Sequence, residues 1–350
     1  MKKYYTRVCN FFYGSSSRNL IKKKKALPLN GNKDISFDHI EILSRNSKKK
    51  IHISNIKKLP ILIKKKINKD LKIITKKKKN FSNFNFDEVP NIMGVLNLTP
   101  DSFSDGGRFN KEDRGFKHAK NLFNLGAKII DVGGESTRPG SKEVKLKDEW
   151  QRIKKTIKKI DKKISLSVDT RKSEIMEKSI KLGIRLVNDI SGLNHDKNSI
   201  SILKKYKTPF VINHIQGTPE IMQIKPYYKN VLYDIYDFFE DKINYIRLNG
   251  IKHNCIILDP GIGFGKNLKH NLNLISNVSI FHSLGFPILL GISRKKFIKD
   301  ISRINDSKLR LGGTISSSLF AMMQGVQILR IHDVNETIQS IKVFKELIKN

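Results

Sequence analysis

From residue 90 onward, short runs of apolar and β-branched residues alternate with amphipathic stretches. Eight such runs occur, and each precedes a segment with a helical spacing of apolar positions. Strands that are apolar almost throughout are typical of a parallel sheet buried on both faces. Eight β-α units predict an α/β fold, a closed (β/α)8 TIM barrel. The predicted strands are 92–99, 128–133, 165–170, 185–190, 209–215, 255–261, 287–293 and 327–333.

An open, doubly wound sheet is the main alternative architecture, but it typically has fewer strands. It would also place a G-x-G-x-x-G sequence after its first strand. The nearest approach, GIGFG at 261–265, follows the sixth predicted strand. The pattern therefore favours the barrel.

The first 88 residues lack this regularity. Residues 1–69 alternate lysine runs with short apolar stretches and show no lasting period, which predicts a Lys-rich and poorly ordered extension. Residues 70–88 carry apolar positions on both sides of a polar turn, which predicts a hairpin capping the bottom of the barrel. We therefore divide the chain into an extension, 1–69, and a barrel unit, 70–350.

The charge is extreme, with a formal net value of +36. Residues 1–88 hold 24 Lys and Arg against 6 Asp and Glu, an excess of 18 and half of the total. Such a balance can indicate a nucleic-acid partner. However, Lys, Asn and Ile are abundant along the whole chain, which favours a compositional origin, and no nucleic-acid recognition motif supports that partner.

Targeting and redox signals are weak. No apolar run approaches the roughly 20 residues that span a bilayer, so we expect no membrane association. Two cysteines without metal-ligand spacing fit a reducing compartment, hence a cytoplasmic protein. The acid-free first 33 residues leave an organellar transit peptide as the alternative, although lysine rather than arginine dominates there.

Polar residues follow nearly every predicted strand, at positions where a buried strand would exclude them. The carboxyl ends of barrel strands converge on one mouth, which holds the active site in this fold. Acidic and amide residues follow the second, third, fourth and sixth strands, and cations follow the last two. This distribution suits a ligand with a donor-rich heterocycle and an anionic tail. The residues are Asp131, Asp169, Asn188 and Asp259 on one side and Lys295, Arg330 and His332 on the other, with Arg138 from a loop.

Two long loops follow the first two strands, and both are rich in Gly, Pro and Ser. Residues 92–107 read IMGVLNLTPDSFSDGG, and residues 126–140 read GAKIIDVGGESTRPG. This pattern resembles the dihydropteroate synthase family. The resemblance continues in six shorter segments: SVDT at 167–170, NDI at 188–190, HIQG at 214–217, LDPGIGFGK at 258–266, SRK at 293–295 and RIHD at 330–333. The resemblance covers about residues 70–350, in order, and says nothing about residues 1–69.

The resemblance implies an enzyme of folate biosynthesis, a transferase that usually forms a homodimer. Such enzymes condense (7,8-dihydropterin-6-yl)methyl diphosphate with 4-aminobenzoate, and Mg²⁺ accompanies the diphosphate. The implied roles are pterin binding by Asp169, Asn188, Asp259, Lys295, Ile215 and Phe264; diphosphate binding by Asn97, Arg138, Arg330 and His332; Mg²⁺ coordination by Asn97; 4-aminobenzoate binding by Phe103, Thr137, Arg138 and Pro139; and catalysis by Asp131, Asp169, Lys295, Arg330 and His332.

One position departs from the family pattern. Lys296 stands where members commonly carry a small hydroxyl residue near the 4-aminobenzoate carboxylate. Two alternative functions stay open at this point. A pterin-binding methyltetrahydrofolate-dependent methyltransferase would share the acidic pocket without needing the phosphate-side residues, and a nucleic-acid-binding protein would use the basic extension.

Overall fold

A computed structural model describes residues 3–80, 84–99 and 113–349. Eight parallel strands form one sheet in the order β10-β9-β8-β7-β6-β5-β12-β11. A parallel bridge between Leu258 of β10 and Ile288, beside β11, joins the two ends, so the sheet closes into a barrel. The predicted (β/α)8 barrel and its eight strands are confirmed. The strands are β5 Asn91–Asn97, β6 Ile129–Gly133, β7 Leu166–Asp169, β8 Leu186–Asp189, β9 Phe210–Asn213, β10 Ile256–Asp259, β11 Leu289–Leu290 and β12 Ile328–Ile331.

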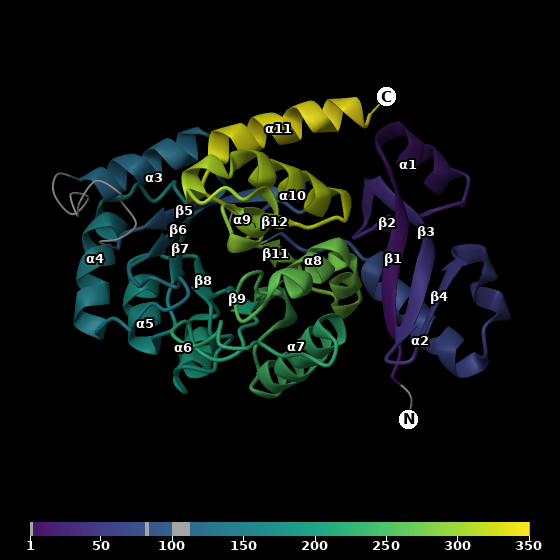
Figure 1. The fold of residues 1–350 in the computed structure, drawn as a ribbon, viewed down its shortest axis with the longest axis horizontal. Coiled ribbons are helices and arrows are strands. Elements are labelled where there is room, and N and C mark those ends of the chain that lie inside the picture. Colours follow the sequence, from purple (N-terminus) through teal and green to yellow (C-terminus); the bar gives the residue numbers. More distant parts are fainter. Residues whose placement is uncertain (1–2, 81–83, 100–112, 350) are drawn as a thin grey trace.

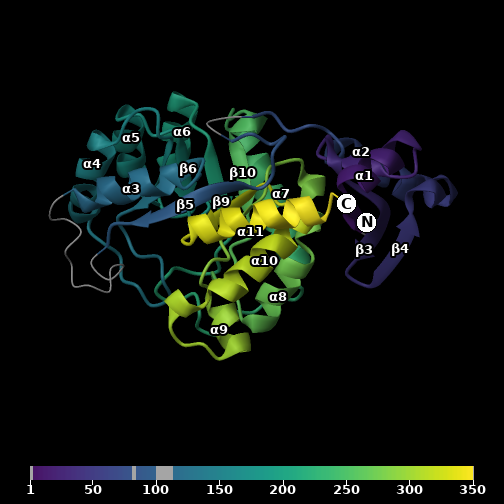
Figure 2. The same cartoon turned by 90° about the horizontal axis from the view of Figure 1, so that it is seen from above.

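Helices surround the barrel, as Figures 1 and 2 show from two directions. Their apolar faces pack on the strands in one continuous core. The helix α11 runs along the outside of the barrel and brings the C-terminus beside the first helix of the chain (Figure 1). The barrel helices are α3 Arg114–Asn124, α4 Leu146–Lys159, α5 Ser173–Lys181, α6 Ser199–Tyr206, α7 Val231–Leu248, α8 Leu268–Ser276, α9 Lys296–Ser302, α10 Leu311–Met323 and α11 Val334–Leu347, with short 3-10 helices η4 His253–Cys255, η5 Val278–Leu284 and η6 Ser307–Leu309.

The bottom of the barrel is closed by two aromatic side chains that precede β5. Phe84 and Phe86 are buried against apolar residues of β5, β6, β8, β9, β10, β11 and β12. The predicted hairpin is wrong, because residues 61–74 form a helix instead. The prediction that residues 70–88 cap the bottom of the barrel is met by Phe84 and Phe86 only.

The prediction of a poorly ordered extension is also wrong, since residues 3–80 fold into a unit with its own apolar core. In its antiparallel sheet, the long strand β3 pairs with β1 on one side and with β2 and β4 on the other. We call residues 3–80 the N-terminal unit. Its elements are β1 Tyr5–Tyr13, α1 Gly14–Lys22, β2 Leu27–Leu29, β3 Asn32–Ser44, β4 Ser47–His52, η1 Ile53–Lys58 and α2 Ile61–Ile74.

The unit folds despite its charge because nearly all of its lysines stay at least partly exposed; Lys78 is the buried exception. On α2, the buried residues Ile67, Leu71 and Ile74 recur at helical spacing, while Lys64, Lys65 and their neighbours face solvent or remain partly exposed. On β4, residues 47–50 are exposed and only Ile51 is buried. Ammonium groups that stay hydrated cost the fold little, so the high charge is compatible with a packed core.

The N-terminal unit packs on the flank of the barrel. Tyr5 stacks on Tyr233 of α7 with ring centroids 4.6 Å apart, and its hydroxyl donates to Asp237 at 3.0 Å. The Ser279 hydroxyl of η5 donates to the carbonyl of Val8, and Tyr13 donates to the carbonyl of Met323. These contacts fix the unit to the barrel wall. Within the described ranges, no helix is both long and apolar enough to cross a membrane.

Candidate active site

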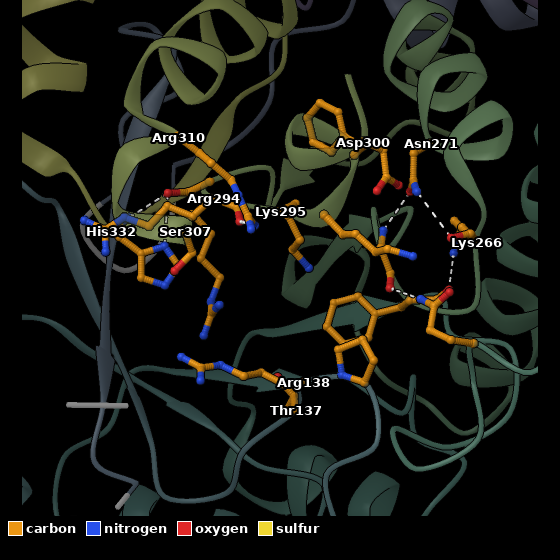
Figure 3. Close-up of a pocket in the computed structure, with 18 of the residues that line it drawn as sticks. Thr137, Arg138, Lys266, Asn271, Arg294, Lys295, Asp300, Ser307, Arg310 and His332 are labelled. Atoms are coloured by element: carbon orange, nitrogen blue, oxygen red, sulfur yellow. Dashed lines mark hydrogen bonds between the residues drawn. The ribbon is translucent and has the colours of Figure 1, made fainter. Parts of the chain in front are cut away.

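A cavity of about 990 Å³ opens at the carboxyl ends of the strands. Strand ends and the loops after β6, β9, β10 and β11 line it, as predicted for the mouth of a barrel. Its volume falls within the range of small-molecule sites. In Figure 3, Thr137 and Arg138 lie on one side of the cavity, and Lys295, Arg294 and His332 lie opposite. The sequence-predicted residues that line it are Asn97, Thr137, Arg138, Pro139, Phe264, Lys295, Arg330 and His332.

The predicted acidic and amide residues are buried and do not themselves line the cavity, but the lining residue Arg330 contacts two of them; the four are Asp131, Asp169, Asn188 and Asp259. Arg330 donates from Nε to Asp131 Oδ2 at 2.6 Å and from Nη2 to Asp169 Oδ2 at 2.8 Å. Asn188 donates to the same oxygen of Asp131 at 2.9 Å. The sequence placed carboxylates and cations on opposite sides of the cavity. Instead, Arg330 lies in direct contact with two of the carboxylates, because its side chain turns inward and is mostly buried.

Two carboxylate oxygens in this group have no protein partner among the described residues. They are Asp131 Oδ1 and Asp169 Oδ1, and both are buried. Burial raises the pKa of Asp169; Arg330 acts to lower it, and the charge of Asp131 raises it again. A buried acceptor without a donor is costly in a folded protein, so this pair is suited to receive N–H groups from a ligand.

Asp259 is held by the turn that follows β10. Its Oδ1 accepts from the Gly261 amide at 2.8 Å, and burial raises its pKa to about 6. Gly261 has a φ of +70°, and a Cβ there would lie 1.9 Å from the carbonyl oxygen of His214. Only glycine fits this approach of the backbone. The tight turn after β10 therefore accounts for the first glycine of the GIGFG sequence.

Lys295 lies over the ring of Phe264, with Nζ 4.1 Å from the ring centroid. Burial lowers its pKa to about 8, although the charges of Asp259 and Asp169 act in the opposite direction. A desolvated ammonium above an aromatic face is held by a cation–π interaction. Lys295 and Phe264 thus form one wall of the cavity.

His332 carries no proton charge in the free site. Burial and the nearby cations Arg330 and Arg294 lower its pKa to about 3, and the ring Nδ1 lies 3.0 Å from the Ser293 hydroxyl. The sequence counted His332 among the cations. The structure favours a neutral, hydrogen-bonding form, because burial and four nearby positive charges, those of Arg330, Arg294, Lys295 and Arg138, oppose its protonation.

Several lining residues were not singled out from the sequence. His118 comes from α3, and Met222, Gln223 and Pro226 come from the loop after β9. None belongs to a strand end, which was the signal used. Of the predicted residues, Ile215 is half-buried on the loop after β9 but does not line the cavity, and Phe103 lies outside the described residues.

The chain is similar to known proteins over most of the barrel. Residues 93–332 match the model of the pterin binding enzyme family. The dihydropteroate synthase of Escherichia coli (strain K12) is 41% identical over 256 residues, which cover 73% of this chain and 90% of that protein. The enzyme of Clostridium beijerinckii is 41% identical over 263 residues, 74% of this chain and 95% of that protein.

Solved structures of dihydropteroate synthases superpose on this chain. A dihydropteroate synthase of Yersinia pestis, in a sulfonamide drug complex, superposes with a TM-score of 0.71 at 38% identity and covers 76% of this chain and 96% of that one. A Clostridium difficile enzyme determined with pteroic acid gives 0.69 at 39% identity, with 78% and 100% covered. The chain therefore belongs to the pterin binding enzyme family and, within it, to the dihydropteroate synthases, transferases of folate biosynthesis.

Proposed function

We propose that the deep end of the cavity binds the dihydropterin ring of the diphosphate substrate. The observation that carries this proposal is the pair of buried, partnerless oxygens, Asp131 Oδ1 and Asp169 Oδ1. A pterin ring presents N–H and amino donors along one edge, which such acceptors match. Asn188 adds an amide on β8, next to Asp169 on β7, and Asp259 adds an acceptor at the end of β10; Lys295 with Phe264 forms the wall against which the ring packs.

The diphosphate would lie toward Arg330 and His332. Arg330 uses two of its five N–H groups on carboxylates, and the others are available to phosphate oxygens. Neutral His332 can donate from Nε2 while Nδ1 contacts Ser293. Arg138 faces the same cavity from the loop after β6. Together these groups offer hydrogen bonds and positive charge to a leaving diphosphate.

The second substrate, 4-aminobenzoate, would bind beside Thr137, Arg138 and Pro139. Related structures support this class of ligand, because a Xanthomonas albilineans dihydropteroate synthase was solved with 4-aminobenzoic acid, at 30% identity and a TM-score of 0.69 over 75% of this chain and 94% of that one. Arg138 is exposed, and no hydrogen bond or ion pair occupies its guanidinium within the described part of the chain, so it is available to a carboxylate. The exposed Lys296 also lines the cavity and adds a second cation within reach.

The reaction then needs no protein nucleophile. Loss of diphosphate leaves positive charge on the pterin methylene, and the carboxylates of Asp131 and Asp169 below the ring stabilise it electrostatically. The aryl amine attacks that carbon and loses a proton. Arg330 touches both carboxylates and points into the cavity, so it would link the site of positive charge to the departing anion.

Mg²⁺ would bind with the diphosphate, held on the protein side by the amide oxygen of Asn97. Mg²⁺ typically takes one or two protein ligands and completes its shell with water and phosphate oxygens. Asn97 fits this, because it ends β5 and lines the cavity, whereas no cluster of three His, Cys, Asp or Glu capable of holding a metal occurs among the residues described. When bound, the ion supplies charge neutralisation to the leaving group.

Turnover of dihydropterin diphosphate and 4-aminobenzoate with Mg²⁺ tests the assignment. We expect Asp259→Ala and Lys295→Ala each to abolish dihydropteroate formation, while Asp241→Asn, an exposed carboxylate on α7, leaves the rate unchanged. Thermal unfolding of each variant shows whether the fold is retained. Full turnover by a folded Asp259→Ala enzyme would contradict the pterin pocket.

We also infer a homodimer formed through α10 and α11. These adjacent helices leave Phe320 45% exposed and Val343 and Leu347 57% and 68% exposed. Burying such residues is favourable, and the family resemblance points to a second copy of the chain. A mass measurement in solution that gives a dimer for the wild type and a monomer for Val343→Lys would support it.

The buried, unpaired Cys9 and Cys255 fit a cytoplasmic enzyme.

A further inference from the structure

Four charged side chains lie buried under the loop that follows β6, outside the cavity lining. Glu135 and Glu149 are acidic, Arg171 and Lys172 are basic, and no more than 8% of any of these side chains is exposed. Two negative and two positive charges balance within this group. The proposed chemistry uses none of them, so their burial needs another explanation.

The pairing is dense and directional. Arg171 donates to both oxygens of Glu135, at 2.9 Å from Nε and 3.2 Å from Nη2. Lys172 Nζ reaches Glu135 at 3.1 Å and Glu149 at 2.7 Å. Burial raises the pKa of Glu135, but hydrogen bonds from Arg171 and from the Val144 amide bring it below its ordinary value, so the carboxylate stays charged. We call these four residues the loop-base network.

The network closes the base of the loop that carries the cavity residues Thr137 and Arg138. Glu135 stands at the start of this loop, and its Oε1 accepts from the Val144 amide at 2.8 Å near the loop's end. Beside it, a Cβ on Gly134 would lie 2.7 Å from the carbonyl oxygen of Glu149, so the chain enters the loop pressed against α4. The backbone is therefore fixed on both sides of Thr137 and Arg138.

The same network reaches the acidic floor of the cavity. Glu149 accepts from the Thr170 hydroxyl at 2.6 Å, and Thr170 directly follows Asp169 on β7. Arg171 and Lys172 continue that strand end. The position of the loop is thus tied to the position of Asp169 through three consecutive residues.

A buried ion network adds little net stability over apolar packing, because desolvation opposes the attraction. Its directional bonds fix geometry instead. Arg138 depends on that geometry, since its own side chain has no described protein partner and its placement follows from the loop backbone. At the loop tip, the Gly140 amide donates a hydrogen bond to the carbonyl of Pro219 at 2.9 Å. Among the described residues, this is the one backbone hydrogen bond from the tip to a neighbouring loop.

We propose that Glu135, Arg171, Lys172 and Glu149 are positioning residues that hold the loop of residues 134–145 over the cavity and so set the affinity for the second substrate. This rests on the proposed binding of 4-aminobenzoate at Thr137 and Arg138. The network acts on the loop and touches neither substrate. Its loss should weaken 4-aminobenzoate binding more than binding of the pterin diphosphate.

Steady-state kinetics of Glu135→Gln test this. Glutamine keeps the size of the side chain and an acceptor for the Val144 amide but removes the charge that holds both cations. We expect the KM for 4-aminobenzoate to rise about 10-fold, corresponding to about 1.4 kcal/mol, with the KM for the pterin diphosphate within about twofold. Arg171→Lys keeps the positive charge without the two-pronged contact and should raise the same KM about threefold.

Glu143→Gln is the matched control. Glu143 approaches the same two cations at 3.8 Å, but it is 52% exposed and holds no loop backbone, so its KM values should equal those of the wild type. Equal KM increases for both substrates, or unchanged KM values in folded Glu135→Gln and Arg171→Lys enzymes, would overturn the positioning role. If Glu135→Gln does not fold, Arg171→Lys decides. A wild type that makes no dihydropteroate would instead refute the proposed site, independently of the network.

Discussion

Replacing Arg330 with methionine should destabilise the fold in a way that depends on pH. Arg330 bridges two carboxylates that are 0% and 4% exposed, while 18% of its own side chain is exposed. Methionine retains an apolar stem of similar length and removes the positive charge. Asp131 and Asp169 would then remain buried side by side without a cation.

The magnitude follows from the burial. Removing one partner of a buried ion pair costs about 3–5 kcal/mol, and the partial exposure of Arg330 places the expected loss at the lower end, about 3 kcal/mol at pH 10, where the carboxyls are charged. Burial already raises the pKa of Asp169, and Arg330 opposes that rise. Without Arg330, the folded-state pKa of Asp169, already about 8, should rise further above the unfolded value of about 3.9.

The sign of the pH dependence is then fixed. A carboxyl with a higher pKa in the folded chain binds its proton more tightly when folded, so the free energy of unfolding falls as pH rises. The loss of unfolding free energy caused by the buried charge is complete above the folded-state pKa, and it vanishes as pH falls toward the pKa of the unfolded chain. Because the pKa of Asp169 is already about 8 in the wild type, the deficit of Arg330→Met relative to the wild type should be large near pH 10 and should shrink toward pH 6.

Urea unfolding followed by circular dichroism at both pH values measures this deficit. Adding Asp131→Asn to Arg330→Met should restore at least about 1 kcal/mol, because one uncompensated charge disappears. Arg294→Met is the control; its pair with Asp333 is more exposed, at 28% and 12%, and should cost about 1 kcal/mol. A deficit below about 1 kcal/mol at pH 10, or an equal deficit at pH 6, would refute the argument.

Three further outcomes test the site and the fold. If protonated Lys295 is needed, kcat/KM should fall as pH rises past about 8, because burial lowers the pKa of Lys295 to about that value. In a pH–rate profile, Lys295→Arg should shift this fall in kcat/KM to higher pH. Gly261→Ala should cost about 3 kcal/mol of unfolding free energy and most activity, because its Cβ would lie 1.9 Å from the carbonyl oxygen of His214. Gly183→Ala, also at positive φ but in open space, should cost only about 1 kcal/mol in the same urea titration. Tyr5→Ala should cost about 3–5 kcal/mol by losing its stacked partner on α7 while leaving both KM values unchanged, since no residue of the N-terminal unit lines the cavity.

The barrel could be predicted because its strands leave an unambiguous signal. Each is a short apolar run between amphipathic segments, and all eight were located, although the predicted ends extended into the loops. Asp131 and Arg330 do lie on the second and the last barrel strand, as predicted. Their mutual contact was not foreseen, because sequence places side chains on elements without showing which way a long arginine turns.

The N-terminal unit was missed for a different reason. Its apolar positions are interrupted by runs of lysine, so composition suggested disorder. The helical spacing of Ile67, Leu71 and Ile74 was a usable signal, as were the alternating apolar positions of β3. What could not be read from sequence is the packing partner, since α2 and the sheet bury their apolar faces against one another and against η5 of the distant barrel.

The loops at the mouth support one another in series, which accounts for the length of the recognisable motifs. The loop after β6 reaches the loop after β9 through Gly140 and Pro219, and that loop reaches the one after β10 through Gln223, which donates to the carbonyl of Gly263 at 2.7 Å. Buried Lys266 then donates back to the His214 carbonyl at 3.2 Å. A motif that supplied only ligand-contacting side chains would leave them on unsupported loops. Residues such as Gly140 and Pro219 therefore help to hold the cavity in shape through these contacts between loops.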